Sequence, residues 1–287
     1  MFIFYKRITY NSIEGKLSEF NDNFIRQGFY GKEFFDRKEI GRGSYGTVLE
    51  VKQLNYDKKV EYFAIKRIEL NFSEPNKDYF NETILKELEN FSIIKDLFTE
   101  KVVRTYDLWF ENSNNLNNSI HKPFKLNIFI QMELCDISLN KLIKEMKTDC
   151  QIIHDNCLTL LGYYISSHLF IQILEGVHYL HTREPPIIHR DLTPYNILIK
   201  INNHNKCIVK IADLGLACLH KYKDQNHTED RGTVIYAAPE VLSSLNYDIR
   251  ADIFSLGVIL QELFQIDINR YLFSKFTVIF FIYISIR

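Results

Sequence analysis

The chain has 287 residues, which is long enough for one large domain or for two lobes with a core between them. Lys plus Arg number 35 and Asp plus Glu 36, so the formal charge is -1, which argues against a chain built to coat nucleic acid or an anionic membrane. Hydrophobic residues make up 46% of the chain, which is too apolar for a disordered protein.

The cysteines give no sign of a zinc site. They include no Cys-x-x-Cys pair and no zinc-like spacing to histidine, and they are Cys135, Cys150, Cys157, Cys207 and Cys218. We therefore expect reduced thiols in a cytoplasmic protein, with a nuclear location as the alternative. The apolar start of the chain is too short for a signal peptide, and we predict that residues 1–33 are an N-terminal extension able to pack on the first lobe.

Three short strands are predicted next, at 35–40, 47–52 and 61–69. The first two enclose a glycine-rich turn with the sequence Gly41-Arg42-Gly43-Ser44-Tyr45-Gly46-Thr47-Val48. The same Gly-x-Gly-x-x-Gly letters serve dinucleotide folds, but there they join a strand to a helix. Here the glycines lie between two strands, where bare backbone can approach a ligand closely. A glycine-bearing hairpin without a ligand is the alternative.

One lysine, Lys66, lies at the end of the otherwise apolar stretch Phe63-Ala64-Ile65. A buried ammonium is costly without a partner, so the pattern predicts an anion nearby, unless the side chain reaches solvent from the strand end. Apolar residues at helical spacing then predict a helix over 81–98. The acidic residues on this helix are Glu82, Glu87 and Glu89.

Further elements follow from the same two periodicities. Strands are predicted at 126–132, 197–200 and 208–211, and helices at 139–146, 160–181 and 248–264. An Asn-rich stretch at 112–122 predicts a surface loop. His178 and His181, near the end of the long helix, are interpreted as structural rather than catalytic. The uncharged run 276–286 is far below the roughly 20 residues that span a bilayer, so no membrane span is predicted.

The segment Ile187–Asn196 is the strongest candidate for chemistry. An apolar pair leads into His189-Arg190-Asp191, and Asn196 follows five residues after Asp191. This spacing lets a carboxylate and an amide oxygen face one site from a single loop. The hairpin that follows leads into a second carboxylate, in Asp213-Leu214-Gly215.

This ordered series of motifs resembles the eukaryotic protein kinases. The resemblance covers about 34–264 and rests on the glycine loop, Lys66 in its strand, His-Arg-Asp-Leu-x-x-x-Asn, Asp-Leu-Gly and Ala238-Pro239-Glu240. It implies an α+β, bilobal fold with a β-rich N-lobe that carries one long helix, and a mainly helical C-lobe. The implied domains are the extension 1–33, an N-lobe at 34–132 and a C-lobe at 133–287. This C-lobe is expected to be incomplete after about residue 264, with an apolar tail at 271–287.

The resemblance also implies ATP and Mg²⁺ as cofactors and assigns roles to individual residues. Asp191 would accept or orient the proton of the substrate hydroxyl, and Asn196 and Asp213 would hold Mg²⁺. Lys66 would hold the phosphates and pair with Glu87, with Glu82 as the alternative. The residues implied to bind ATP are Ile40, Gly41, Arg42, Gly43, Ser44, Tyr45, Gly46, Thr47, Val48, Ala64, Lys66, Met132, Glu133 and Cys135.

Two positions depart from the family pattern. Leu214 replaces the usual Phe, which is a mild change because both fill an apolar slot. Thr193 replaces the Lys that contacts the transferring phosphate, so reduced turnover is expected. Pro194 and Gly232-Thr233 still favour Ser/Thr over Tyr as the acceptor. Thr228 is the predicted site of a regulatory phosphate that Arg190 would bind.

A narrower likeness points to the kinases of the translation initiation factor 2 alpha subunit. It rests on 102–109, which resembles a fourth N-lobe strand, on the insertion that follows, on 130–133 and on 252–257. Wee-type kinases share part of it and are an alternative. The implied partner is a protein substrate, with no direct nucleic-acid binding. A homodimer or a missing C-terminal partner is expected, and a nucleotide-binding pseudokinase that serves as an interaction module is the alternative function.

Overall fold

The computed structural model describes a set of residues that form two compact units. The described residues are 26–43, 46–72, 91, 94–95, 97, 99–112, 124–149, 151–154, 157–202, 204–214, 235–239, 241 and 248–266. The first unit comprises Met1–Ile84 and Thr105–Leu134, and the second comprises Leu85–Arg104 and Cys135–Arg287. The predicted domain boundaries, including the extension at 1–33, stay a prediction.

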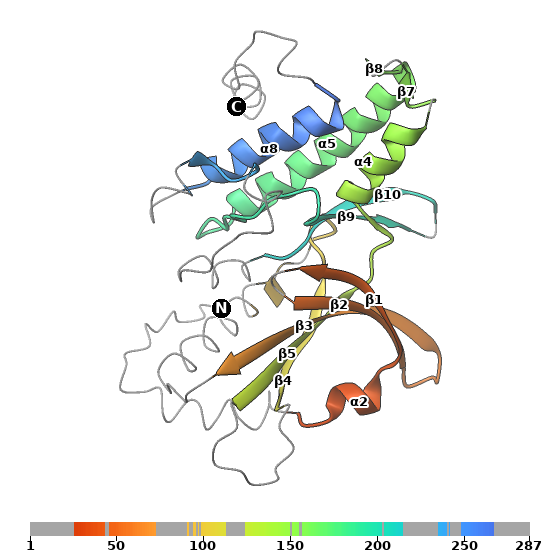
Figure 1. Ribbon diagram of the computed structural model, residues 1–287, viewed down its shortest axis with the longest axis vertical. Helices are drawn as coiled ribbons and strands as arrows, with labels where there is room; N and C mark the ends of the chain where they lie inside the picture. The colour runs from red at the N-terminus through yellow and green to blue at the C-terminus, as the bar shows by residue number, and fades with distance from the viewer. Residues whose placement is uncertain are drawn as a thin grey trace. The chain divides into compact units, whose positions relative to one another are not determined.

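The first unit is built on a five-stranded antiparallel sheet, in the order β1-β2-β3-β5-β4 (Figure 1). Its strands are β1 (Phe35–Gly43), β2 (Gly46–Leu54), β3 (Val60–Phe72), β4 (Thr105–Asn112) and β5 (Phe124–Glu133). Four of these strands contain the predicted ranges and extend them by a few residues at their ends. The sheet therefore provides the β-rich lobe that the sequence predicts.

The fourth strand begins later than predicted. β4 starts at Thr105, whereas the sequence suggested a strand from residue 102. Val102 instead forms an isolated parallel bridge with Ile211, and the Val103 N–H donates to the Ile211 carbonyl at 2.8 Å. Val102 belongs to the apolar core of the second unit. The predicted start of the fourth strand is therefore wrong, because the bridge partner of Val102 lies in the second unit and could not be read from local periodicity.

One face of the sheet carries an aromatic core. Its buried residues are Tyr30, Phe34, Val51, Ile65, Trp109 and Phe129. The Trp109 ring stacks on Phe34 at 5.7 Å and on Phe129 at 5.2 Å between centroids. Tyr30 belongs to α2 (Phe29–Glu33), a short helix beside the sheet in Figure 1. No helix is predicted there, because five residues are too few for helical periodicity to show.

A buried carboxylate fastens this helix to the sheet. Glu111 in β4 accepts hydrogen bonds from the Tyr30 N–H at 2.6 Å, the Gly28 N–H at 3.2 Å and the Trp109 Nε1–H at 3.0 Å. Two of these donors are N–H groups at the start of α2 that have no hydrogen-bond partner within the helix. The negative charge of Glu111 is also favourable at a helix N-terminus. Residues just before the sheet are therefore an integral part of this unit.

The second unit combines helices with a small sheet. Its helices are α4 (Leu139–Thr148), α5 (Leu160–His181) and α8 (Arg250–Leu263). Its strands are β6 (Ile137–Ser138), β9 (Ile197–Ile201) and β10 (Cys207–Ile211), in the order β10-β9-β6, and the hairpin β7 (Ile153–His154) with β8 (Cys157–Leu158). α5 has the predicted bounds, and α5 and α8 run side by side (Figure 1).

The core of the second unit lies between these helices and β9-β10. It includes Ile173, Val177 and Leu180 of α5 and Leu256 and Ile259 of α8. α5 begins at an N-cap, because the Thr159 hydroxyl accepts a hydrogen bond from the Gly162 N–H at 3.1 Å. Within the part of the chain that the structure describes, no helix has both the length and the apolar character that crossing a bilayer requires.

Candidate active site

Four of the predicted ATP-binding residues share one face of the first unit's sheet. In the strand register, Lys66 of β3 lies opposite Val48 of β2, and Ala64 lies opposite Met132 of β5. Directly opposed residues point to the same face, as do residues two apart in one strand. Ile65, whose side chain alternates to the other face, belongs to the aromatic core. The lysine face and the aromatic face are therefore opposite sides of one sheet.

Lys66 is the buried cation of that face. It is only 5% exposed, and its neighbours across the strands are the apolar residues Val48 and Ile130. A buried ammonium group between apolar side chains is stabilised by an anionic partner, which can be a carboxylate or a phosphate. The predicted carboxylate, Glu87, and its alternative, Glu82, lie outside the described residues. The pairing of Lys66 with Glu87 therefore stays a prediction.

The glycine-rich segment joins two antiparallel strands, as predicted. β1 and β2 pair from Phe35↔Lys52 to Gly43↔Gly46, so Gly41 and Gly43 lie within β1 rather than in the turn. Ser44 and Tyr45, between the paired glycines, lie outside the described residues. This strand–turn–strand context differs from the strand–turn–helix of dinucleotide folds, and the role of the hairpin in binding phosphates stays a prediction.

Only glycine fits at Gly46. Its φ is +126°, and a Cβ atom there would lie 2.3 Å from the Arg67 carbonyl oxygen in the backbone of β3. We expect Gly46→Ala to lower the free energy of unfolding by about 2 kcal/mol, through backbone strain and the displaced β3 carbonyl. Urea unfolding would measure it. Gly43→Ala is the matched control, because a Cβ at Gly43 meets nothing within 4 Å; equal losses in the two variants would contradict this reading.

The other predicted ATP-binding residues lie along the strands and at the end of the sheet. Ile40 is exposed, and Arg42 forms an exposed ion pair with Glu39 at 2.7 Å. Thr47 is half-buried in β2. Glu133 is the buried last residue of β5, and Cys135 is half-buried in the second unit. The backbone from Glu133 to Cys135 thus passes from one unit into the other.

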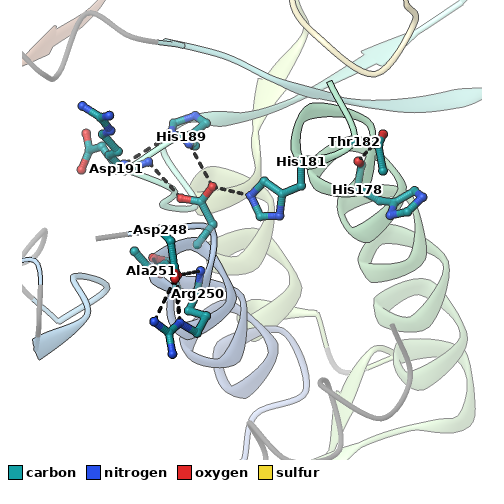
Figure 2. Close-up of polar contacts among 11 residues, drawn as sticks. His178, His181, Thr182, His189, Asp191, Asp248, Arg250 and Ala251 are labelled. Carbon is teal, nitrogen blue, oxygen red and sulfur yellow. Dashed lines mark hydrogen bonds and ion pairs between the residues drawn. The ribbon is translucent and has the colours of Figure 1, made fainter. Parts of the chain in front are cut away.

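In the second unit, the buried carboxylate of Asp252 holds the His189-Arg190-Asp191 segment in place. Oδ2 accepts hydrogen bonds from the His189 N–H at 2.9 Å and from His181 Nε2 at 2.7 Å, and Oδ1 accepts one from the Arg190 N–H at 2.9 Å. Figure 2 labels His181, at the end of α5, and His189, in the loop, and draws their contacts with this carboxylate as dashed lines; His189 contributes its backbone N–H. The contact of His181 with this buried carboxylate agrees with the structural role predicted for it.

The electrostatics of Asp252 follow from these contacts. Burial alone would raise the pKa of its carboxyl, but the hydrogen bond from His181, the electrostatic interaction with His189 and the hydrogen bonds from the two backbone N–H groups together outweigh burial. The pKa of Asp252 is therefore below its ordinary value. Asp252 stays ionised in the folded protein, and a fully buried charge pins the loop to α8.

His189 connects the two carboxylate-bearing segments of the site. Its Nε2 lies 2.8 Å from the Ala212 carbonyl oxygen, and its Nδ1 accepts a hydrogen bond from the Asp191 N–H at 3.3 Å. Because a carbonyl oxygen can only accept, Nε2 is the donor in the first contact, and Nδ1 is the acceptor in the second. This single tautomer sets Asp191 on one side and Asp213, which follows Ala212, on the other.

Asn196 completes the group of oxygen donors. Its side-chain NH₂ donates to the Asp191 carbonyl at 2.8 Å and to Asp191 Oδ2 at 3.2 Å, which turns the amide oxygen to the opposite side. The Ala212 N–H donates to the Asn196 carbonyl at 2.8 Å, so Asp213 follows directly after a backbone contact with this residue. Asp213 has a left-handed backbone with φ 64°, a strained conformation that often marks functional sites.

This donor set fits Mg²⁺. Magnesium prefers oxygen ligands and takes only one or two protein carboxylates beside phosphate and water, which the Asp213 carboxylate and the Asn196 amide oxygen can provide. Among the residues that the structure describes, no group of three or more His, Cys, Asp and Glu gathers as a transition-metal site would require. The second unit therefore brings together Asp191, Asn196 and the segment of Asp213, while Lys66 belongs to the first unit and its approach to them stays a prediction.

Sequence reasoning missed a second anchor on α8. The Tyr236 hydroxyl donates to Glu262 Oε1 at 2.6 Å, and the Ser255 hydroxyl donates to the Tyr236 carbonyl at 2.7 Å. Burial, and then the hydrogen bond to Glu262, raise the pKa of Tyr236, so its hydroxyl stays protonated. The same helix thus holds both the loop that carries Asp191 and the segment before Ala238-Pro239. Gly215, Thr228, Thr233 and Glu240 lie outside the described residues.

Most of the chain is similar in sequence to known proteins. Residues 34–273 match a family model described as "Protein kinase domain". The chain is 36% identical over 238 residues to the interferon-induced, double-stranded RNA-activated protein kinase of Rattus norvegicus, which covers 83% of this chain and 42% of the relative. It is 35% identical over 167 residues to eukaryotic translation initiation factor 2-alpha kinase 1 of Mus musculus, covering 54% of this chain and 26% of the relative.

A plant protein is similar over nearly the same region. The chain is 34% identical over 227 residues to a mitogen-activated protein kinase homologue of Nicotiana tabacum, which covers 79% of this chain and 52% of the relative. The chain therefore spans between 26% and 52% of the lengths of these three relatives.

Proposed function

We propose that this chain, which belongs to the eukaryotic protein kinase family, transfers the γ-phosphate of ATP to a serine or threonine hydroxyl of a protein. The observation that carries the proposal is the His189-centred network, which sets Asp191, Asn196 and the Asp213 segment side by side over the buried carboxylate of Asp252. Phosphoryl transfer depends mainly on positioning and charge, and this network supplies positioned oxygen groups.

Each residue has a role that follows from its place. Asp191 is held by its own N–H and by Asn196, so its carboxylate can orient the acceptor hydroxyl and take its proton. Asn196 and Asp213 would hold Mg²⁺, which when bound neutralises charge on the phosphate oxygens. Lys66, on the sheet face that also carries Val48, Ala64 and Met132, would bind the phosphates of an ATP whose adenine meets the backbone of Glu133–Cys135.

The proposed substrate is the alpha subunit of translation initiation factor 2, and the proposed location is the cytoplasm. Support comes from the 35% identity to a relative that bears this factor's name, eukaryotic translation initiation factor 2-alpha kinase 1. The match to a mitogen-activated protein kinase homologue at 34% identity is a reason to test other protein substrates beside it. A homodimer, or a partner for the C-terminal part, belongs to the same proposal.

The test is transfer of radiolabelled phosphate from ATP to purified translation initiation factor 2 alpha subunit and, separately, to a generic basic protein. We expect labelled phosphoserine or phosphothreonine that depends on Mg²⁺ and disappears with EDTA. Labelling of the generic protein alone would remove the substrate proposal and keep the kinase. No labelling of either protein would remove the enzyme proposal.

A second candidate function is a nucleotide-binding interaction module without turnover. The observation that favours it is Thr193, a buried, uncharged residue where the family usually carries a lysine. Mg-ATP binding in the absence of any phosphate transfer would select this candidate. Transfer above the EDTA background would reject it.

If the missing charge limits turnover, restoring it should raise the rate. We expect Thr193→Lys to increase the transfer rate by about tenfold or more, since one added group that stabilises transition-state charge is typically worth 10²-fold or more. Thr193→Gln is the matched control, because it adds a similar length without charge. Initial rates at saturating ATP would measure both, and an equal or lower rate for the lysine variant would show that charge at this position is not limiting.

A further inference from the structure

α5 carries an exposed apolar stripe that no described element covers. Leu160 is 88% exposed, Tyr164 69% and Ile171 55%, and these positions recur at helical spacing on one side of the helix. His168, which stacks beside Tyr164, fills the gap between them. The opposite side of α5 is packed in the core of the second unit. The stripe is therefore a second apolar face on a helix whose first face is already used.

The sequence of α5 is that of a helix surrounded by protein. Glu175 is its one acidic residue, and it contains no lysine or arginine, while Leu, Ile, Tyr and Phe occur all round. A helix that is apolar on every side is normally buried on every side. Contiguous exposed apolar residues of this kind mark a surface that another segment or partner covers.

The path of the chain identifies a segment that can reach the stripe. α8 ends beside the first half of α5, because the Ser166 hydroxyl donates to the Leu263 carbonyl at 2.9 Å. The Phe264 ring then lies edge-on to Tyr163, at 5.5 Å between centroids. Tyr163 is the direct neighbour of Tyr164 in the stripe. The sequence after Ile266 therefore departs from a point next to this surface.

The sequence that departs from there has the matching composition. After 267–270, which contain Asp267, Asn269 and Arg270, come 271–287, which include the uncharged, largely aromatic and β-branched run 276–286. A helix rises about 1.5 Å per residue, so the stripe from Leu160 to Ile171 is about 16 Å long, and 11 residues reach at least that far in any regular conformation. The run is also about half the length that would span a bilayer, which requires about 20 residues.

We propose that residues 271–287 pack on the α5 stripe of the same chain and bury Leu160, Tyr164 and Ile171. The segment closes the uncovered side of α5 and is thereby part of the second unit. The proposal is independent of the phosphate-transfer activity, because none of its residues belongs to the site around Asp191.

The test is limited trypsin digestion of the full chain, with cleavage after Lys275 followed by mass spectrometry. Lys275 lies within the proposed covering segment, so its cleavage tracks the population in which the segment is released. We expect the double variant Tyr164→Asp with Ile171→Asp to be cleaved there about tenfold faster than the wild type. Tyr56→Asp with Ile201→Asp is the matched control, because it charges two exposed apolar residues outside the stripe and should leave the rate unchanged.

A second pair of substitutions distinguishes release of the segment from unfolding of the whole chain. Phe280→Asp with Ile282→Asp, in the segment itself, should give the same increase, and all four changes together should add nothing further, because both pairs break one contact. Effects of the two pairs that multiply would overturn the proposal.

Two other outcomes would also overturn it. Protection that grows with protein concentration would assign the stripe to a second copy of the chain. Protection of Lys275 that requires added phosphatidylcholine vesicles would assign the segment to a lipid surface.

Discussion

Replacing Asp191 by Asn is expected to lower the rate of phosphate transfer by about 10³-fold while leaving Mg-ATP binding close to that of the wild type. The amide has nearly the same shape as the carboxylate but cannot take the proton of the acceptor hydroxyl. Its side-chain oxygen can still accept the hydrogen bond that Asn196 gives to Asp191 Oδ2 at 3.2 Å. The loop should therefore keep its conformation and lose only its chemistry.

Initial rates of label transfer, measured beside calorimetric Mg-ATP binding, would separate these two effects. Asp57→Asn is the matched control, because Asp57 lies exposed in the turn between β2 and β3 and the same substitution there should leave both quantities unchanged. A variant at Asp191 that retains more than about a tenth of the wild-type rate would show that this carboxylate is not the group that handles the proton. Loss of nucleotide binding together with the rate would indicate a damaged loop instead.

Much of the site could be predicted because its residues lie in short motifs with a fixed chain order. Asp191 and Asn196 share one loop, and the hairpin that leads to Asp213 follows at once, so sequence distance and spatial distance agree. The bounds of α5 were also predictable, since its apolar side repeats at helical spacing for 22 residues. The local sequence pattern is sufficient to predict an element when that element is long, and to predict a site when its functional groups are close in sequence.

Contacts between distant segments could not be predicted in the same way. The pairing of Val102 with Ile211 joins residues whose local patterns are both those of ordinary strands, and only the core of the second unit decides between partners. The Tyr236–Glu262 hydrogen bond likewise joins an irregular segment to a helix, and neither residue stands out in its own surroundings. The relation of Lys66 to Asp213 is of this kind, since the two residues belong to different units.

Asp252→Asn is expected to lower the free energy of unfolding by about 3–5 kcal/mol, the usual cost of breaking a buried charge network at one partner. The carboxylate accepts on both oxygens, from the N–H groups of His189 and Arg190 and from His181. An amide has only one oxygen, so in either orientation its NH₂ faces a donor. Because the released backbone carries Asp191, the transfer rate should fall together with stability. Urea unfolding would measure the first effect, and label transfer the second.

Asp248→Asn, just before the start of the same helix, is the matched control. Asp248 lies exposed just before α8 and pairs with Arg250 at 2.8 Å, as Figure 2 shows, so its loss should cost less than about 1 kcal/mol. Comparable losses of stability in the two variants would mean that the burial of Asp252 is not what makes it important. If Asp252→Asn lost the expected 3–5 kcal/mol but kept its transfer rate, Asp252 would contribute to stability without positioning the loop that carries Asp191.

The pH dependence of the difference in unfolding free energy between wild type and Asp252→Asn independently tests whether the Asp252 carboxylate is ionised in the folded protein. The pKa of Asp252 is lowered in the folded protein from its ordinary value of 3.8, because the hydrogen bonds and the electrostatic interaction with His189 outweigh the effect of burial. Above about pH 4 the carboxylate is ionised in both states, and its full contribution to stability is present. As the pH falls below that value the unfolded chain takes up the proton first, so the contribution declines and is lost as the pH passes through the lower, folded pKa.

The stability gap between wild type and Asp252→Asn should therefore be constant from pH 7 to about pH 5 and shrink below about pH 4. A gap that instead widens on acidification would show that the buried carboxyl is protonated in the folded protein and that the loop is held by other contacts.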